Sequence, residues 1–348
     1  MAAAALLALL MALPAAAQEE GAPVLVGGRP AVGVFNPFNP AGAGGVLLEI
    51  GPSAPFPEPF DALLFQGELP DAAVSFEAAR EENGVWSAWL RASLHRAGDG
   101  RFWGKAVFPK AGAGRVRLRA LSPGGSSAPV TVYALEVFLS GGERPGAPGS
   151  GPAVPEGVEP LPVIERDAWK AKPPKQPYEP HVPDRVTQHH SAGRLPGTLD
   201  ESLAEVLFIQ DFHQNGRGWN DIAYHFMVDP EGRIFRGRPV NVAGSHTLND
   251  NKGNVGICFM GDHHPPTNHP VASAELAASV RIGRWLQAGY GVTPASYSGH
   301  RDRNPGHTDC PGDILYALLP KVREDWSARS GFGARLQAWF RGLRLTVP

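Results

Sequence analysis

The sequence predicts a two-domain protein: an N-terminal all-β, sandwich-like domain, then an α/β domain with a mixed central sheet flanked by helices. Three observations predict this fold class. The 348 residues are too many for one typical domain and enough for two. In the first part of the chain, short alternating apolar runs recur between Gly and Pro, with no helical period. After residue 160, strand-like and helical patterns are mixed.

The overall composition excludes several classes of protein. Together, the 42 glycines and 35 prolines make up a larger fraction of the chain than average, but a smaller one than the roughly 25–30% that marks low-complexity disorder. Hydrophobic residues make up 43% of the chain, enough for true cores. Charged residues reach only 19% and the formal net charge is −2, so we expect no binding to nucleic acid. The two cysteines, Cys258 and Cys310, cannot build a disulfide scaffold.

Residues 1–17 are typical of a signal peptide. After Met1 they are all apolar or Pro, and the small residues Ala15, Ala16 and Ala17 precede Gln18, as at a signal-peptidase site. The run is shorter than the roughly 20 residues that span a bilayer, so we expect no stable membrane span. No Lys or Arg precedes the apolar run, and an uncleaved anchor or a disordered tail are the alternatives. We expect a secreted or periplasmic protein.

Residues 24–139 form the predicted all-β domain. Arginines alternate with apolar residues from Arg115 to Ala120, the period of a strand with one solvated face. A β-sandwich is the natural way to close a block of this size. Trp86, Trp89 and Trp103 are expected to pack in its core, with exposed platforms for sugar rings as the alternative. A spacer or accessory binding role is open.

Two segments flank the second domain. Residues 140–160 contain eleven Gly or Pro among 21 residues, which predicts an interdomain linker that buries too little apolar surface to become ordered. Residues 327–348 hold four arginines and no acidic residue. This basic tail is interpreted as a docked or frayed helix, or as an amphipathic segment that touches anionic polymer or membrane.

The second domain, residues 161–326, alternates strands and helices. Residues 186–190 are a strand that runs into a loop at Gly193, and residues 198–215 are a helix that stops at Gly216. A hairpin follows, with strands on either side of the turn at residues 229–232, and then a buried central strand at residues 255–260. Helices are expected over residues 276–289 and from Asp313, where Pro320 interrupts or restarts the second one.

Histidine and cysteine placement predicts a metal site. Adjacent residues of a strand point to opposite faces, so only one of His189 and His190 should reach a given ion. His300 and Cys310 lie ten residues apart on one loop and can converge on it. A His₂Cys set leaves the fourth tetrahedral position of zinc to water, as in catalytic sites. His307 could instead be a fourth ligand and make the site structural.

Three segments in order resemble a known family. They are residues 189–193 (His-His-Ser-Ala-Gly), residues 218–226 (Gly-Trp through Tyr-His-Phe) and residues 299–312 (Gly-His-Arg through Cys-Pro-Gly). Together they resemble the zinc amidases of the type-2 N-acetylmuramoyl-L-alanine amidase and peptidoglycan recognition protein superfamily. The resemblance covers residues 161–326, whereas the β block only weakly resembles accessory domains found ahead of some bacterial amidases.

The resemblance implies the roles of eight residues. One zinc ion per chain would be held by His189, His300 and Cys310. Tyr224 and Thr308 match catalytic positions of the family. The residues implied to line the substrate groove are His246, His213 and Trp219.

The implied reaction is hydrolysis of the amide between N-acetylmuramic acid and L-alanine in peptidoglycan. The partners would be peptidoglycan or muropeptides, and the protein is expected to be a monomer. Recognition proteins that bind without cutting typically lack the metal-binding Cys, so Cys310 favours an enzyme. A non-catalytic peptidoglycan-binding module and a zinc peptidase that cuts within the stem peptide are the alternatives. The general base is open, with His307 and His225 as candidates.

Overall fold

The structure is a computed structural model, and it describes residues 24–25, 31–33, 45–69, 73–122, 130–140 and 158–328. The predicted signal peptide, most of the predicted linker and almost all of the basic tail lie outside these residues. Below, the β block means the described residues up to 140, and the α/β domain means residues 158–328. None of the helices in the described part of the chain combines the length and apolar character needed to cross a bilayer.

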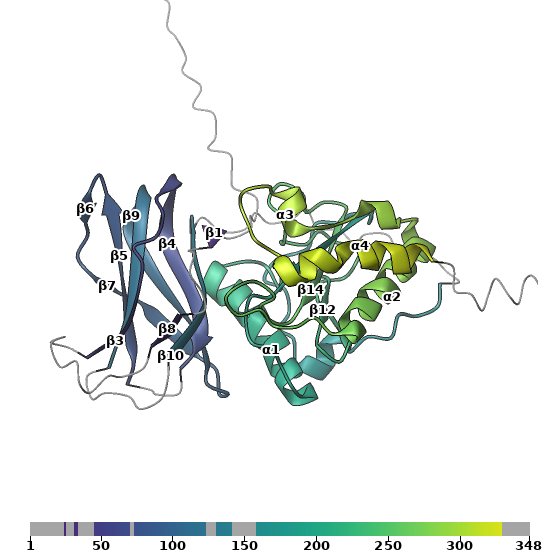
Figure 1. Cartoon of the computed structure of the whole chain (residues 1–348), viewed down its shortest axis with the longest axis horizontal. Helices are drawn as coiled ribbons and strands as arrows, with labels where there is room; N and C mark the ends of the chain where they lie inside the picture. The colour runs from purple at the N-terminus through teal and green to yellow at the C-terminus, as the bar shows by residue number, and fades with distance from the viewer. Residues whose placement is uncertain are drawn as a thin grey trace, which may run out of the picture.

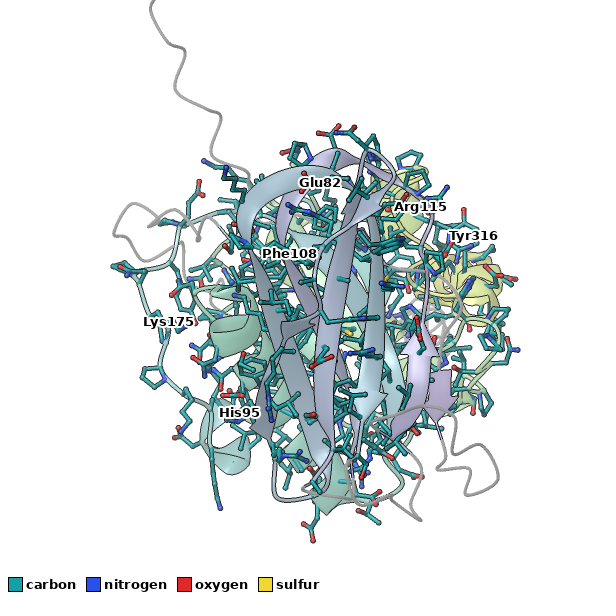
Figure 2. The ribbon with its side chains drawn as sticks, turned by 90° about the vertical axis from the view of Figure 1, so that its left-hand side faces the viewer. Glu82, His95, Phe108, Arg115, Lys175 and Tyr316 are labelled. Atoms are coloured by element: carbon teal, nitrogen blue, oxygen red, sulfur yellow. The ribbon has the colours of Figure 1, made fainter. Side chains whose placement is uncertain are left out.

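The β block contains strands only, and every pairing in it is antiparallel. Its strands are β1 (Val24–Leu25), β2 (Ala31–Gly33), β3 (Val46–Ile50), β4 (Phe56–Glu68), β5 (Ser75–Glu82), β6 (Val85–Trp86), β7 (Leu90–Arg91), β8 (Ser93–Arg96), β9 (Arg101–Leu121) and β10 (Val130–Phe138). Figure 2 looks onto this block, whose long strands run side by side.

The long strand β9 organises the block. Its first half pairs with β8 and its second half with β3 and β5, while β4 pairs with it from Arg101 as far as Gly114. Apolar side chains from these strands and from β10 form one buried core, with Phe65, Phe76 and Phe102 in mutual ring contact. On β4, Leu63 and Phe65 point into this core, so Leu64 and Gln66 point out of the opposite face.

The α/β domain has a five-stranded mixed sheet in the order β13-β12-β14-β11-β15. The strands are β11 (Arg185–His190), β12 (Phe226–Val228), β13 (Ile234–Arg236), β14 (Asn254–Phe259) and β15 (Tyr297–Gly299). β12, β14, β11 and β15 are parallel, and β13 pairs antiparallel with β12 as the predicted hairpin. All six residues of β14 are buried, as expected of a central strand covered on both faces.

Helices cover both faces of this sheet (Figure 1). The helices are η1 (Arg166–Trp169), α1 (Leu199–Asp211), η2 (Phe212–Arg217), α2 (Ser273–Tyr290), η3 (Pro294–Ser296), α3 (His300–Arg303) and α4 (Asp313–Ser327). α2 and α4 share one apolar cluster with one face of the sheet, and α1 and η2 share another with the opposite face. The predicted α/β class with a mixed, helix-flanked sheet is therefore confirmed.

Three local expectations were wrong. The first helix continues through Arg217 as a π-helix and stops at Gly218 instead of Gly216, because Gly218 adopts the left-handed conformation at φ 87°. Pro320 lies inside α4 without ending it. The expected loop at residue 300 begins with the short helix α3.

The tryptophans of the β block also differ from expectation. Trp86 and Trp89 lie outside the core and are half-buried, with the Arg117 guanidinium 4.3 Å from each ring centroid. Trp103 is buried, but it packs with Leu64 against α1 and η2 of the α/β domain. Figure 1 shows α1 beside the face of the block formed by β4, β9 and β10.

Candidate metal centre and its pocket

Three elements bring the predicted ligands together on the α1 side of the sheet. His189 is near the end of β11, in register with Cys258 of β14. His300 follows β15 directly, as the first residue of α3. Cys310 returns to the site because the backbone N–H of Arg301 donates a hydrogen bond to its carbonyl oxygen at 2.9 Å. One ligand atom from each of the three residues lies within 4.8 Å of the others.

The donor set fits a zinc ion. The distance from Cys310 Sγ to His189 Nδ1 is 3.5 Å. Two ligands on one tetrahedral zinc, bound at about 2.0–2.3 Å, lie about 3.5 Å apart. Among the described residues, the group contains these three side chains and no fourth His, Cys or carboxylate. Three protein ligands are typical of a zinc site with a position left for water or substrate.

Hydrogen bonds fix which nitrogen of His189 faces the ligand group. His246 Nε2 lies 3.2 Å from the carbonyl oxygen of Asn254, which can only accept, so this nitrogen carries the proton. His246 Nδ1 is then an acceptor, with Thr247 Oγ1 at 2.8 Å and His189 Nε2 at 3.0 Å. His189 therefore donates through Nε2 and presents the lone pair of Nδ1 toward Cys310. Gly256 leaves room for this arrangement, since a Cβ there would lie 2.7 Å from the His246 ring.

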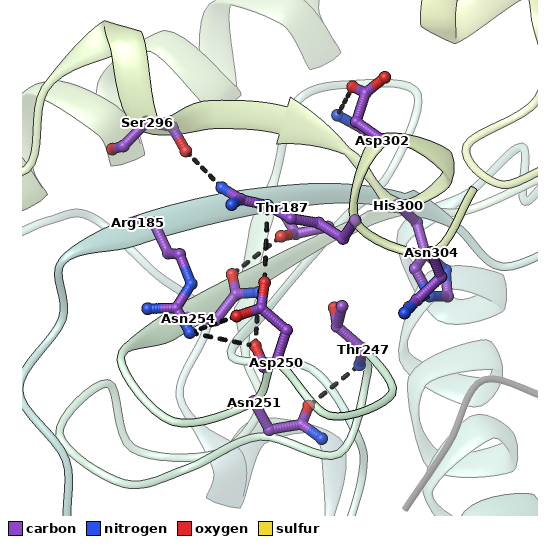
Figure 3. A network of polar contacts seen from close by, with 12 residues as sticks. Arg185, Thr187, Thr247, Asp250, Asn251, Asn254, Ser296, His300, Asp302 and Asn304 are labelled. Carbon is purple, nitrogen blue, oxygen red and sulfur yellow. Dashed lines mark hydrogen bonds and ion pairs between the residues drawn. The ribbon is translucent and has the colours of Figure 1, made fainter.

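His300 is oriented in the same way. Its Nε2 lies 3.1 Å from Oδ1 of Asn304, and the Asn304 amide in turn donates to the carbonyl oxygen of Leu248 at 3.0 Å. Because the Asn304 amide nitrogen is the donor to Leu248, its oxygen is the acceptor for His300. Nδ1 of His300 is left for a ligand. Figure 3 shows His300 and Asn304 beside the loop that carries Thr247, Asp250 and Asn251.

Burial sets the protonation of the group. It lowers the pKa of His189 well below its usual value and the pKa of His300 to about 4, so both imidazoles are neutral, as metal ligands must be. Burial raises the pKa of the Cys310 thiol to about 12. A bound divalent cation would deprotonate that thiol.

All eight residues to which the family resemblance gives a role line one pocket. Besides the three ligands, these are Tyr224, Thr308, His246, His213 and Trp219. The Tyr224 ring lies 5.2 Å from that of His189, and burial holds its pKa well above the usual value, so its phenol is a hydrogen-bond donor. Thr308 Oγ1 accepts from the backbone N–H of Cys310 at 3.1 Å. His213 stacks on Trp219 with 5.0 Å between ring centroids.

The other residues considered as ligands or as the general base lie outside the ligand group. His307 is exposed and does not line the pocket. Both ring nitrogens of His225 are engaged by the backbone, with Val242 O at 2.9 Å and Gly256 N at 2.9 Å. His190 lines the pocket, but its Nδ1 accepts from the backbone N–H of His263. Asp302, two residues after His300, accepts from the backbone N–H of Gly299 and so stabilises the start of α3.

The pocket also contains residues that the sequence analysis missed. Gln66, Ala134 and Glu136 of the β block line it, together with Arg217 from the end of η2. The motifs of the α/β domain carry no information about the β block. Strand alternation predicts only which face these side chains share, so no signal in the sequence identifies them.

Known proteins resemble the α/β domain. Residues 179–313 match the family described as N-acetylmuramoyl-L-alanine amidase. Peptidoglycan-recognition protein SC2 of Drosophila simulans is 33% identical over 140 residues, which are 40% of this chain and 73% of that protein. Peptidoglycan recognition protein 1 of Mus musculus is 30% identical over 162 residues, 45% of this chain and 85% of that protein. The solved structure of wild-type Drosophila PGRP-LB is 32% identical and covers 45% of this chain and 92% of its own, with a TM-score of 0.41.

These similarities define the class: the α/β domain is that of a peptidoglycan-related protein. The chain belongs to the type-2 N-acetylmuramoyl-L-alanine amidase and peptidoglycan recognition protein superfamily. The resemblance given by the sequence motifs is thereby confirmed.

Proposed function

We propose that the protein is a zinc-dependent N-acetylmuramoyl-L-alanine amidase that acts on peptidoglycan or muropeptides outside the cytoplasm, as a monomer. The observation that carries the proposal is the buried His189, His300 and Cys310 group, which opens onto a pocket. A protein that only recognises peptidoglycan has no need of a thiol ligand with an open coordination position beside it. The signal-like residues 1–17 support export.

The neighbours of the metal centre suit amide hydrolysis. When bound, zinc supplies Lewis-acid chemistry, which polarises a carbonyl and acidifies water. Tyr224 keeps its proton because burial holds the pKa of its phenol well above neutral. It can therefore donate to the carbonyl oxygen of the scissile amide as negative charge develops there.

Thr308 is suited to holding water or the substrate carbonyl. Its oxygen already accepts the backbone N–H of Cys310, and its O–H remains available to donate to water or to the substrate carbonyl. An alcohol is too weak a base to take a proton at neutral pH, so Thr308 has a positioning role. His246 and Asn304 hold His189 and His300 in the tautomers that present Nδ1.

Release of new N-terminal L-alanine from muropeptides tests the proposal. Purified protein should release it, lose the activity with a chelator and regain it with zinc. Cys310→Ser should abolish both zinc binding and release. Cys258→Ser is the matched control for zinc binding, because Cys258 is fully buried on β14 and is not among the three grouped ligands. The Cys258 side chain contacts Tyr224, so the two variants are compared by zinc content and not by release.

Two results would favour the alternatives. Tight muropeptide binding with no release at any zinc loading would indicate a non-catalytic recognition module. Mass analysis that shows cleavage inside the stem peptide would indicate a zinc peptidase. Equal loss of zinc binding from Cys258→Ser and Cys310→Ser would contradict the ligand assignment.

A further inference from the structure

The outer face of the β block forms part of the pocket wall. On β10, Leu135 and Val137 point into the core of the block, so Ala134 and Glu136 point outward. Ala134 lies in register with Gln66 of β4. All three outward side chains line the pocket that also contains the His189, His300 and Cys310 group.

Buried polar contacts hold this wall in place. Arg101 of β9 donates to Glu205 of α1 at 3.0 Å, and the two side chains are 0% and 1% exposed. Glu136 forms an ion pair with Arg217 of η2, with both side chains 3% exposed. The outer face of the β block therefore has a fixed position against the α/β domain. A domain held only by a flexible linker would not have one.

Further hydrogen bonds join the same two surfaces. Trp103 Nε1 donates to Asp211 at 2.8 Å, and Lys105 Nζ donates to the carbonyl oxygen of Gly216 at 2.9 Å. The helix pair α1–η2 is therefore joined to the β block from Glu205 to Arg217. This is the helix pair that carries His213 and ends next to Trp219.

Gln66 has the chemistry of a ligand-contacting residue. The residue is 5% exposed, and its side-chain oxygen accepts from Arg101 at 2.8 Å. Its amide NH₂ makes no hydrogen bond within the described part of the chain and is not fully buried, so it is open to the pocket. An amide in that position can donate to an acceptor on a bound ligand.

We propose that the β block is a specificity wall of the pocket, and that Gln66 and Ala134 contact the stem peptide of the substrate. This inference rests on the proposed function. Gln66 would donate to a carbonyl or carboxylate oxygen of the peptide, and the small side chain of Ala134 leaves room for it. Arg217 offsets the charge of Glu136, so the wall does not repel acidic stem residues. A peptide is the part of a muropeptide that is richest in such oxygen acceptors.

The test compares muramoyl substrates that carry one, two, three and four stem residues. Ala134→Leu adds a larger side chain to the wall and fills the space beside it. Gln66→Met removes the amide donor and keeps a side chain of similar volume. Val107→Leu is the control, because Val107 lies on β9 of the same block and is 51% exposed outside the pocket. Zinc content and the melting temperature of each variant are measured alongside.

Both wall variants should raise KM by about tenfold or more for the longer stems, and little for a single L-alanine. An increase of KM that grows with stem length cannot come from a general loss of folding or zinc. If Ala134→Leu does not fold, Gln66→Met decides the question. Unchanged KM, or an equal rise at every stem length, would overturn the inference.

Failure of the proposed function would give a different result from failure of the pocket-wall inference. If wild-type protein with zinc releases no L-alanine, the catalytic proposal fails. The dissociation constants of the same four compounds, measured by calorimetry, then replace KM. Length-dependent weakening by the two wall variants would still support the wall, and its absence would reject it.

Discussion

His246 lies between His189 and the backbone of β14, with ring-nitrogen distances of 3.0 Å to His189 and 3.2 Å to Asn254 O. We predict that His246→Ala weakens zinc binding about 10- to 100-fold, the usual effect of losing a hydrogen bond that orients a ligand. Without it, Nε2 of His189 loses its acceptor and the ring can adopt the other tautomer. Competition against a chromogenic zinc chelator measures the effect.

His307→Ala is the matched control for this variant. His307 lies in the segment between His300 and Cys310, but it is exposed and outside the pocket. Its removal should leave zinc affinity unchanged. A drop in affinity for His307→Ala similar to that for His246→Ala would show that His307 is a fourth ligand.

At the scale of residues, what the sequence could predict depended on local motifs. His189, His300 and Cys310 lie in recognisable segments, and the structure brings their ligand atoms within 4.8 Å of one another. The roles of Asn304 and Asn254 depend on how loops return to the site, which residue spacing does not encode. Gln66 reaches the pocket from a strand more than 100 residues before the first ligand.

At the scale of elements, the start of α2 should make stability depend on pH. Glu275 accepts from the backbone N–H of Ala272 at 2.7 Å, and its other oxygen has no partner within the described residues. Burial raises its pKa from 4.5 to about 7, opposed by the Ala272 bond and aided by the charge of Asp229. Its contribution to stability is therefore full below pH 4.5 and is lost as the pH rises to about 7.

Glu275→Gln should remove this dependence, because glutamine keeps an acceptor for Ala272 and does not titrate. At pH 8 the variant should be more stable than wild type, by an amount on the order of 3 kcal/mol at most. Urea unfolding at pH 4.5, 6 and 8 measures the difference. Identical pH profiles for the variant and wild type would contradict the assignment.

Glu201→Gln is the control for this prediction. Glu201 occupies the equivalent position at the start of α1, where backbone hydrogen bonds from Gly197 and Thr198 lower its pKa. Because its pKa is lowered, its stabilising effect is lost only as the pH falls through that lowered pKa. The wild-type slope between pH 4.5 and 7 should persist in Glu201→Gln.

Helices and strands could be predicted from the sequence where a single pattern of residues determines them. The hairpin β12–β13 and the buried strand β14 follow from turn residues and an apolar run. The stop at Gly218 could not be distinguished from one at Gly216, because both glycines follow the same helical pattern. Trp86 and Trp89 were expected in the core because tryptophan is usually buried, but they lie with Arg117 on the outside.

At the scale of the whole molecule, the Gly/Pro-rich residues 140–160 predict an interdomain linker, which says nothing about how the two domains pack. In the structure, Leu64 and Trp103 of the β block pack into the cluster formed by α1 and η2. Docking of this kind depends on the shape and charge of two finished surfaces. Neither the shape nor the charge of a folded surface can be read from a short stretch of sequence. The sequence therefore predicts the two domains better than it predicts how they pack together.

The ion pair between Arg101 and Glu205 lies at the centre of this association. Burial raises the pKa of Glu205 even though Arg101 opposes the shift, so the charged pair is costly to desolvate. Glu205 Oε2 and two nitrogens of Arg101 have no hydrogen-bond partner among the described residues. An apolar pair could therefore fill the same space with a smaller penalty.

We predict that Arg101→Met alone lowers the free energy of unfolding by about 3–5 kcal/mol, because it leaves the Glu205 carboxylate buried and unpaired. The double variant Arg101→Met/Glu205→Leu should recover most of that loss. Urea denaturation followed by tryptophan fluorescence measures both, and wild type should show one transition because the two parts share an apolar cluster. If Arg101→Met costs less than about 1 kcal/mol, the value of an exposed pair, or if wild type unfolds in two separate steps, the β block is only loosely docked. The pocket wall would then not be fixed, because Arg101 also holds Gln66 in place.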